Sequence, residues 1–298
     1  MTTTPIDLEP TETRPTWLAA HPIAGSLTIA VLTGLALQLT HMIDFQERVA
    51  EVVGWNLSVR FIDFAFRTVL GALTVLAVLP RLFGHMGRRH WFPGYLRYLR
   101  LSGGPSPRFT FAGSMVSLSI LLVLVVGLAA AFDSLRGEFD YALDDSRWFV
   151  LILALVPALW EELAFRGLML SNLQRRFRPW TAIVTTSLLF GLFHISNLLL
   201  REPGEVIPEM VLATGVSIGW GYLVVRTGSV IPAMVSHYSI NVFIELLVDT
   251  DLNESASAAI FGSLIIVYPL LTVITTWAVN RRRAGRAPAD RRLASGAV

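Results

Sequence analysis

The sequence contains no cysteine and no lysine, and it carries little charge of either sign. Without cysteine the chain has no disulfide, no thiolate-bound metal and no cysteine nucleophile. Charged residues make up 15% of the 298 residues, whereas an ordinary soluble domain has about 25%. Hydrophobic residues make up 53%, and the mean hydropathy is +0.58. The composition therefore predicts an integral membrane protein, and we expect the lipid bilayer, and no nucleic acid, as its surroundings and partner.

Long apolar segments recur along the whole chain. A helix needs about 20 mostly apolar residues to cross the hydrocarbon core of a bilayer. Eight segments meet or approach this length, at 21–40, 61–83, 109–132, 148–173, 180–200, 209–225, 231–248 and 257–279. The sequence therefore predicts an all-α, polytopic membrane protein, in which a bundle of about eight transmembrane helices encloses an intramembrane cavity.

The connections between these segments alternate in charge. Arginines dominate 84–108, 175–178 and the C-terminal tail, whereas acidic residues dominate 133–147, 202–209 and 249–254. Arginine-rich connections stay on the cytoplasmic side of a membrane. The pattern thus predicts a multi-pass protein of the cell (plasma) membrane with both termini in the cytoplasm. The first fifteen residues are polar and rich in proline, unlike a cleavable signal peptide.

These features divide the chain into five parts. We expect a disordered cytoplasmic tail at 1–20, N-terminal transmembrane helices at 21–145, a core at 146–248, a last transmembrane helix at 249–280 and a basic cytoplasmic tail at 281–298. The core differs from the rest because several of its apolar segments contain polar side chains.

Two adjacent carboxylates interrupt the apolar segment WFVLILALVPALWEELAFRGLML. A charged carboxylate at membrane depth costs about 2.5 kcal/mol or more on insertion scales, so each needs a partner or a use. Arg166 follows Glu162 by four residues and can pair with it on one helix face. Glu161 lies about 100° round an α-helix from Glu162, away from this pair. Glu161 is therefore the candidate proton-transfer group, and Glu162 with Arg166 is interpreted as a structural pair.

Only two of the six histidines lie well inside apolar segments. His194 follows Phe190 by four residues. His237 precedes Asn241 by four residues, so these two share a helix face. Taken singly, each histidine is equally well explained as an interhelical hydrogen-bonding group. Together with Glu161, however, they place polar groups at membrane depth on three separate predicted helices.

In chain order these patterns are EExxxR, FxxxH and HxxxN. The ordered set resembles the CPBP intramembrane proteases, which include the type II CAAX prenyl endopeptidases and the bacterial abortive-infection (Abi)-like proteins. The resemblance covers roughly residues 146–248, the catalytic core of such a protein. It implies an intramembrane endopeptidase that hydrolyses peptide bonds of membrane-embedded or lipidated substrates.

The resemblance also implies a role for each residue. Glu161 and His194 would activate a water, and His237 with Asn241 would stabilise the oxyanion. A carboxylate is a suitable general base toward water, and histidine and asparagine N–H groups are suitable oxyanion donors. Structural support would come from Glu162, Arg166 and Phe190. We expect this site in the cytoplasmic half of the membrane.

The sequence is compatible with a metal but does not require one. Glu161, His194 and His237 are the residue types of a two-histidine, one-glutamate zinc shell, and members of the family are often called metalloproteases. The HExxH helix of many zinc proteases is absent. A metal-free glutamate mechanism fits the same residues, and it is the one we prefer.

Three other interpretations use the same residues. An intramembrane serine protease would pair Ser217 with His237, although no Gly-x-Ser-Gly loop is present. A proton- or ion-coupled transporter would line a path with glutamate and histidine, although no internal repeat is visible. A non-catalytic scaffold or immunity factor would keep the fold and act by binding.

Overall fold

The computed structural model describes residues 16–43, 45–54, 57–86, 90–101, 107–133, 149–199, 201–248 and 254–284. Throughout these ranges the regular structure is helical, without a β-sheet, so the predicted all-α class is confirmed. Trp17–Ala20, within the tail predicted at 1–20, form a short helix whose first turn is capped by Thr16. Residues 1–15 and the basic tail from 285 lie outside the described residues.

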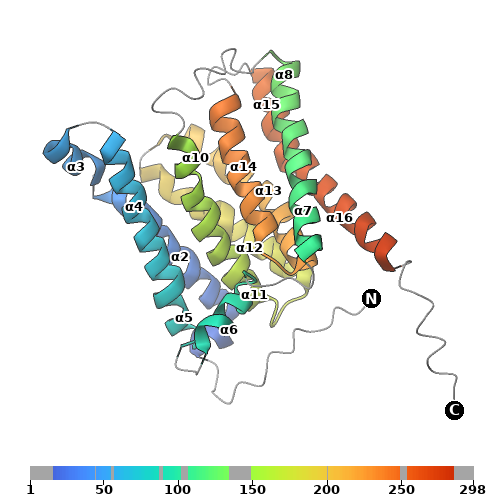
Figure 1. The fold of residues 1–298 in the computed structure, drawn as a ribbon, viewed down its shortest axis with the longest axis horizontal. Helices are drawn as coiled ribbons and strands as arrows, with labels where there is room; N and C mark the ends of the chain where they lie inside the picture. The colour runs from blue at the N-terminus through green and yellow to red at the C-terminus, as the bar shows by residue number, and fades with distance from the viewer. Residues whose placement is uncertain are drawn as a thin grey trace.

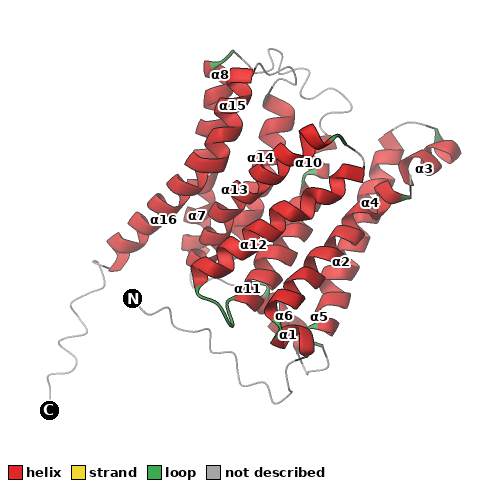
Figure 2. Ribbon diagram, turned by 180° about the vertical axis from the view of Figure 1, so that it is seen from behind, coloured by secondary structure: helices red, strands yellow, loops and turns green. Residues whose placement is uncertain are grey.

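The N-terminal half supplies one outer side of the bundle and part of another. Its helices are α1 (Trp17–Ala20), α2 (Pro22–Met42), α3 (Phe45–Val53), α4 (Leu57–Leu73), the π-helix η1 (Thr74–Val78), α5 (Leu79–Leu82), α6 (Trp91–Tyr98), α7 (Pro107–Leu121), the π-helix η2 (Leu122–Gly127) and α8 (Leu128–Ala131). In Figures 1 and 2, α2 and α4 lie on one side of the bundle and α7 lies on the other.

The C-terminal half forms the centre. Its helices are α10 (Phe149–Leu153), the π-helices η3 (Pro157–Glu161) and η4 (Leu163–Met169), α11 (Leu170–Leu173), α12 (Pro179–Phe193), the 3₁₀-helix η5 (His194–Leu199), α13 (Pro203–Thr227), α14 (Ile231–Leu247), α15 (Glu254–Gly262), the π-helix η6 (Ser263–Val267) and α16 (Tyr268–Ala284). Helix α13 packs against α12, α14 and α16 (Figure 1).

Glycines allow the central helix α13 to approach its neighbour closely. A Cβ atom at Gly215 would lie 2.8 Å from the Ile265 Cα, and one at Gly219 would lie 2.9 Å from the Tyr268 ring. Such distances are shorter than real Cβ contacts, so a side chain at either position would push the last span away. Small residues four apart are the usual means of close helix packing in lipid.

Among the described residues, six helical stretches are long and apolar enough to cross a membrane, at 22–39, 59–82, 107–131, 179–199, 203–227 and 255–278. They correspond to six of the eight predicted spans, and the chain is a polytopic membrane protein. The other two predicted spans are the stretch from α10 to α11 and helix α14. The first changes helix type at Pro157, and the second has only 17 residues. The first of these two segments carries Glu161 and Glu162, and the second carries His237 and Asn241. These polar residues interrupt the apolar sequence of each segment.

The two ends of the bundle carry opposite charges. One end gathers α5, α6 and α11 (Figure 1), and we call it the arginine-rich end. Its arginines are Arg81, Arg97, Arg100, Arg108, Arg175, Arg176, Arg178 and Arg226, and no acidic residue that the structure describes lies there. The opposite end, the acidic end, gathers α3, α8, α15 and the connection from η5 to α13. Its acidic residues include Glu47, Glu51, Asp133, Glu202 and Glu205.

Candidate active site

A buried carboxylate links an arginine and a histidine from two different spans. Arg166 Nη1 lies 2.9 Å from Glu162 Oε1, and His237 Nδ1 lies 2.9 Å from the same oxygen. The Glu162 and Arg166 side chains have no exposed surface. With Arg166 beside it the carboxylate is ionised and only accepts, so His237 donates through Nδ1–H. The Nε2 atom of His237 is thereby left for other contacts.

Arg166 makes further contacts beyond its ion pair, although its buried Nε atom has no hydrogen-bond partner among the described residues. Its Nη2 atom donates to Ser217 Oγ at 2.6 Å, and Ser217 in turn donates to Ser187 at 3.0 Å. The guanidinium also lies 4.0 Å from the centre of the Phe190 ring and 5.0 Å from that of Trp220, which adds cation–π attraction. The ion pair predicted from the spacing is therefore the core of a larger buried cluster. Ser217 belongs to this cluster and makes its hydrogen bonds with Arg166 and Ser187, not with His237.

Glu161 differs from its neighbour in having no such partner. The residue is 8% exposed, and its carboxylate forms no ion pair with Arg166 or with either histidine. The buried Oε2 atoms of Glu161 and Glu162 both accept no hydrogen bond from the described residues. The Glu161 carboxyl lies within electrostatic range of His237 and His194. The structure separates the two acids as the spacing predicts: Glu162 is paired, and Glu161 is not.

The segment that carries both acids is wound more widely than an α-helix. Residues 157–161 and 163–169 form π-helical turns. Single π-helical turns are rare in proteins, and those that occur are often found at functional sites. The winding changes the angle between successive side chains, yet the Glu162–Arg166 pair still forms at the predicted spacing.

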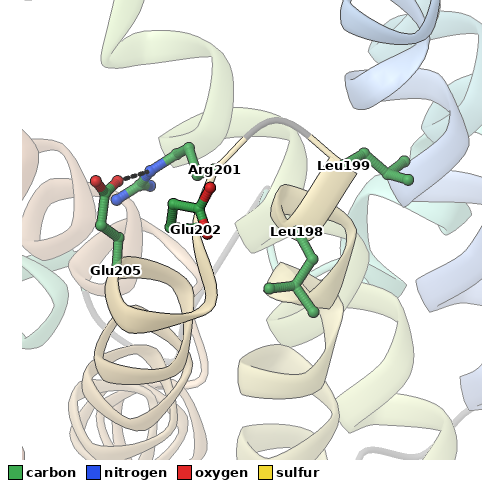
Figure 3. Close-up of a pocket in the computed structure, with 5 residues that line it drawn as sticks. All are labelled: Leu198, Leu199, Arg201, Glu202 and Glu205. Atoms are coloured by element: carbon green, nitrogen blue, oxygen red, sulfur yellow. Dashed lines mark hydrogen bonds and ion pairs between the residues drawn. The ribbon is translucent and has the colours of Figure 1, made fainter.

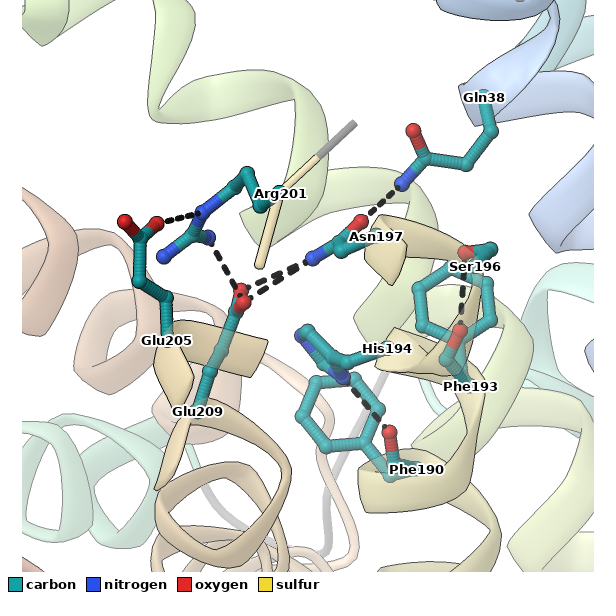
Figure 4. Close-up of polar contacts among 9 residues, drawn as sticks. All are labelled: Gln38, Phe190, Phe193, His194, Ser196, Asn197, Arg201, Glu205 and Glu209. Atoms are coloured by element: carbon teal, nitrogen blue, oxygen red, sulfur yellow. Dashed lines mark hydrogen bonds and ion pairs between the residues drawn. The ribbon is translucent and has the colours of Figure 1, made fainter. Parts of the chain in front are cut away.

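His194 ends α12 and begins the 3₁₀-helix η5. Its Nδ1 atom lies 2.9 Å from the carbonyl oxygen of Phe190, one turn earlier (Figure 4). Because a carbonyl oxygen only accepts, Nδ1 carries the proton, and in the neutral ring Nε2 is an acceptor. The residue is half-buried. Both site histidines therefore use Nδ1 for an internal bond and keep Nε2 for chemistry.

Phe190 lies at the centre of these groups. Its ring is 5.1 Å from the His194 ring and 5.9 Å from the His237 ring, in an edge-to-face arrangement with each. Trp220 stacks on His237 at 4.7 Å. These aromatic rings pack against the two imidazoles and cover the buried Arg166 side chain. The supporting role of Phe190 stays a prediction.

Asn241 lies one turn after His237 on α14 and is half-buried. Its side chain makes no hydrogen bond with the residues that the structure describes. The backbone thus places it on the His237 side of the helix, where its amide is available to a bound molecule.

A second polar network near His194 was not predicted from the sequence. Asn197 accepts from Gln38 Nε2 at 2.9 Å and donates to both carboxylate oxygens of Glu209 at 3.1 Å (Figure 4). Arg201 Nη1 reaches Glu209 at 2.8 Å. The network fastens η5 between α2 and α13, and so holds the segment that begins with His194. The one sequence signal that could have indicated this network is Asn197, which lies three residues after His194.

The described residues contain no group of three or more histidine, aspartate or glutamate side chains placed to hold a metal ion. Glu161, His194 and His237 therefore do not form a coordination cluster in this geometry. Both histidines do bind oxygen acceptors through Nδ1, as zinc-bound histidines usually do. The preference for a metal-free mechanism stays a prediction.

Comparisons with known proteins agree with the site. Residues 144–243 match the family model described as Type II CAAX prenyl endopeptidase Rce1-like. The chain is also similar to CAAX prenyl protease 2 of Methanococcus maripaludis, with 27% identity over 175 residues, which cover 54% of this chain and 64% of that protein. No solved structure matches the chain.

The matched segment contains every predicted site residue from Glu161 to Asn241. This segment is therefore similar to the Rce1-like domain of the CPBP family, which confirms the resemblance inferred from EExxxR, FxxxH and HxxxN. The chain covers about 64% of the length of the curated relative.

Proposed function

We propose that this protein is an intramembrane endopeptidase that hydrolyses peptide bonds of membrane-embedded or lipidated substrates with a water activated by Glu161 and His194. The observation that carries the proposal is the state of Glu161. It is a buried carboxylate without an arginine partner, next to two histidines whose Nδ1 atoms are already bonded. The Rce1-like match supports protease chemistry for this segment.

The first step is attack on the scissile carbonyl. Glu161 accepts a proton from the water while the water oxygen bonds to the carbonyl carbon, and His194 Nε2 accepts the second hydrogen bond of that water and orients it. The carbonyl π-electrons move to oxygen and form an oxyanion. Glu161 then gives its proton to the amide nitrogen as the carbon–nitrogen bond breaks, so that an amine and a carboxylic acid leave.

The oxyanion needs N–H donors aimed at it. Asn241 can donate through its amide. His237 can donate through Nε2 when its ring carries a proton on each nitrogen, with the Glu162 carboxylate as the acceptor at Nδ1. Removing one donor from an oxyanion site costs about 2.7–4 kcal/mol in other enzymes. Glu162 therefore supports the reaction through His237 as well as through Arg166.

The cellular setting is proposed from the charge pattern. The positive-inside rule supports an arginine-rich end that faces the cytoplasm. We propose that both termini lie on that side and that the protein is in the plasma membrane. The substrate is expected to be a peptide segment held in, or anchored to, the same bilayer.

The test is a comparison of membrane proteomes from cells that produce the wild type or Glu161→Gln at equal levels. We expect a C-terminal fragment of one or a few membrane proteins with the wild type, and the uncut protein with the variant. Equal fragments in both strains would overturn the proposal. If neither strain shows cleaved membrane proteins, and Glu161→Gln gives the same cellular phenotype as the wild type, the result would favour a binding role over catalysis.

A further inference from the structure

The pocket at the end of η5 is not lined by the predicted catalytic residues. Figure 3 shows two leucines on one side of it and three charged side chains on the other, namely Leu198, Leu199, Arg201, Glu202 and Glu205. A different group of residues bears on the proposed reaction. It lies on α7, α14 and α16, and α7 packs against the other two helices (Figure 1).

Three buried hydroxyl groups, one from each of these helices, form a row that ends beside His237 in the chain. Ser117 Oγ lies 2.7 Å from the Tyr268 hydroxyl and is also hydrogen-bonded to Ser236 Oγ. Ser236 Oγ in turn donates to the Pro232 carbonyl at 2.6 Å. The three hydroxyl-bearing residues are fully buried. Because Ser236 directly precedes His237, the row reaches the part of α14 that carries a predicted oxyanion donor.

The carbonyl at the end of the row fixes its direction. A carbonyl oxygen only accepts, so Ser236 uses its single hydroxyl hydrogen there. Ser117 therefore donates to Ser236, and Tyr268 donates to Ser117. Each hydroxyl hydrogen thus has one place, and Tyr268 is the first donor. A buried row that is fully satisfied in this way holds its three helices in one mutual position.

The Tyr268 ring makes a second connection to His237. A Cβ atom at Gly219 would lie 2.9 Å from this ring, so the ring lies directly against the α13 backbone beside Trp220. Trp220 stacks on the His237 ring, with 4.7 Å between the ring centres and 19° between the planes. The Trp220 indole also lies near the Tyr268 hydroxyl, outside hydrogen-bonding geometry. Tyr268 therefore contacts the surroundings of His237 both through its hydroxyl and through its ring.

We propose that Tyr268 is a positioning residue for His237, acting through Ser117 and Ser236. This inference rests on the proposed function, in which His237 donates to the oxyanion. The row fixes α14 at Ser236, so that the Nδ1–H group of His237 stays at the Glu162 carboxylate and Nε2 keeps one position for the substrate. Neither Tyr268 nor Ser117 lies within residues 144–243, so this support comes from outside the segment that matches the family model.

Kinetics of the purified, reconstituted protein test this role. Tyr268→Phe keeps the ring and removes the first donor. A misplacement of about 1 Å can cost about a hundredfold in rate, so for a smaller shift of His237 we expect kcat to fall about tenfold. KM should stay within about twofold, because the row does not contact the substrate. Wild-type kcat in Tyr268→Phe overturns the inference.

Two further variants show whether the effect passes through the row. Ser117→Ala leaves the Tyr268 hydroxyl as a buried donor without a partner, so it should lower kcat at least as much. The double variant should be no slower than Ser117→Ala alone, because both changes act on one row. Thr276→Val is the matched control, since it removes another buried hydroxyl about two turns later on α16. An equal loss in Thr276→Val overturns the inference.

Nuclear magnetic resonance of the imidazole tests the positioning without any need for activity. The protein carries isotope-labelled histidine, and the His237 signals are assigned by their absence in His237→Gln. We expect Tyr268→Phe to shift or broaden the hydrogen-bonded Nδ1 signal of His237, and Thr276→Val to leave it in place. If Tyr268→Phe does not fold, Ser117→Ala carries the same test. An unmoved signal overturns the inference. A moved signal, with no cleavage even by the wild type, leaves the positioning standing and counts against the protease.

Discussion

The Nδ1 atom of His237 lies 2.9 Å from Glu162 Oε1, the same oxygen that pairs with Arg166. One buried carboxylate thus connects the third motif of the family pattern to the first. The sequence spacing assigned Glu162 to Arg166 alone, as a brace for the helix that bears Glu161. The structure gives it a second task, which is to hold the ring of His237 through Nδ1.

Replacing Glu162 by glutamine should therefore impair catalysis. The amide keeps the shape of the side chain but offers the His237 Nδ1–H group only a neutral, weaker acceptor. By analogy with partners of catalytic and metal-bound histidines, we expect kcat to fall about 10–100-fold with little change in KM. Glu162→Asp, which keeps the charge, should recover part of the loss. Wild-type kcat in Glu162→Gln would show that the carboxylate does not act through His237.

Replacing Arg166 by alanine should destabilise the fold as well as the site. It leaves Glu162 charged and fully buried with only His237 beside it, and it removes the contact with the Phe190 ring. Breaking a buried ion pair from one side costs about 3–5 kcal/mol. We expect a clearly lower melting temperature in detergent. The double variant Glu162→Gln/Arg166→Met should melt closer to the wild type, because no unpaired charge remains. Normal melting of Arg166→Ala alone would count against the pair as a brace.

Gly191, three residues before His194, should not tolerate a side chain. A Cβ atom there would lie 1.9 Å from Thr214 Oγ1 and 2.7 Å from the Met210 carbonyl oxygen. Overpacking of this kind costs about 1–3 kcal/mol, and separating α12 from α13 would also move His194. We expect Gly191→Ala to lower both the melting temperature and the cleavage rate. Gly262→Ala is the matched control, because no described atom lies within 4 Å of its added Cβ. Equal behaviour of the two variants would contradict the packing argument.

Chelation should leave cleavage largely intact. Glu161, His194 and His237 do not form a metal-holding group in the described structure, and the proposed steps use only proton transfer and hydrogen bonds. We expect the purified protein to keep most of its activity after treatment with a chelator and removal of released ions. Complete loss of activity that only added zinc restores would reverse this prediction.

The features set by local spacing were predictable from the sequence. The all-α membrane class follows from composition, and the Glu162–Arg166 pair follows from a four-residue separation that survives even the π-helical winding. The meeting of Glu161 with His194 and His237 was predicted from the family pattern. In each case the information lies within a short segment or in the order of motifs.

The rest depends on contacts between distant segments. The bond from Glu162 to His237 joins residues 75 positions apart, and that from Gln38 to Asn197 joins residues 159 apart. No periodicity encodes which of two adjacent acids a remote histidine will meet.

Cleavage of a defined substrate by purified, reconstituted protein tests the role of Glu161 most directly. The wild type, Glu161→Gln and Ser217→Ala are compared after equal folding has been verified by thermal melting. We expect the wild type to cleave the substrate. Glu161→Gln removes the general base, so its rate should fall at least about a thousandfold. Ser217→Ala should keep cleaving, because the Ser217 hydroxyl accepts a hydrogen bond from Arg166 and takes no part in the reaction. Cleavage by Glu161→Gln at the wild-type rate, with none by Ser217→Ala, would contradict the glutamate mechanism and make the protein a serine protease.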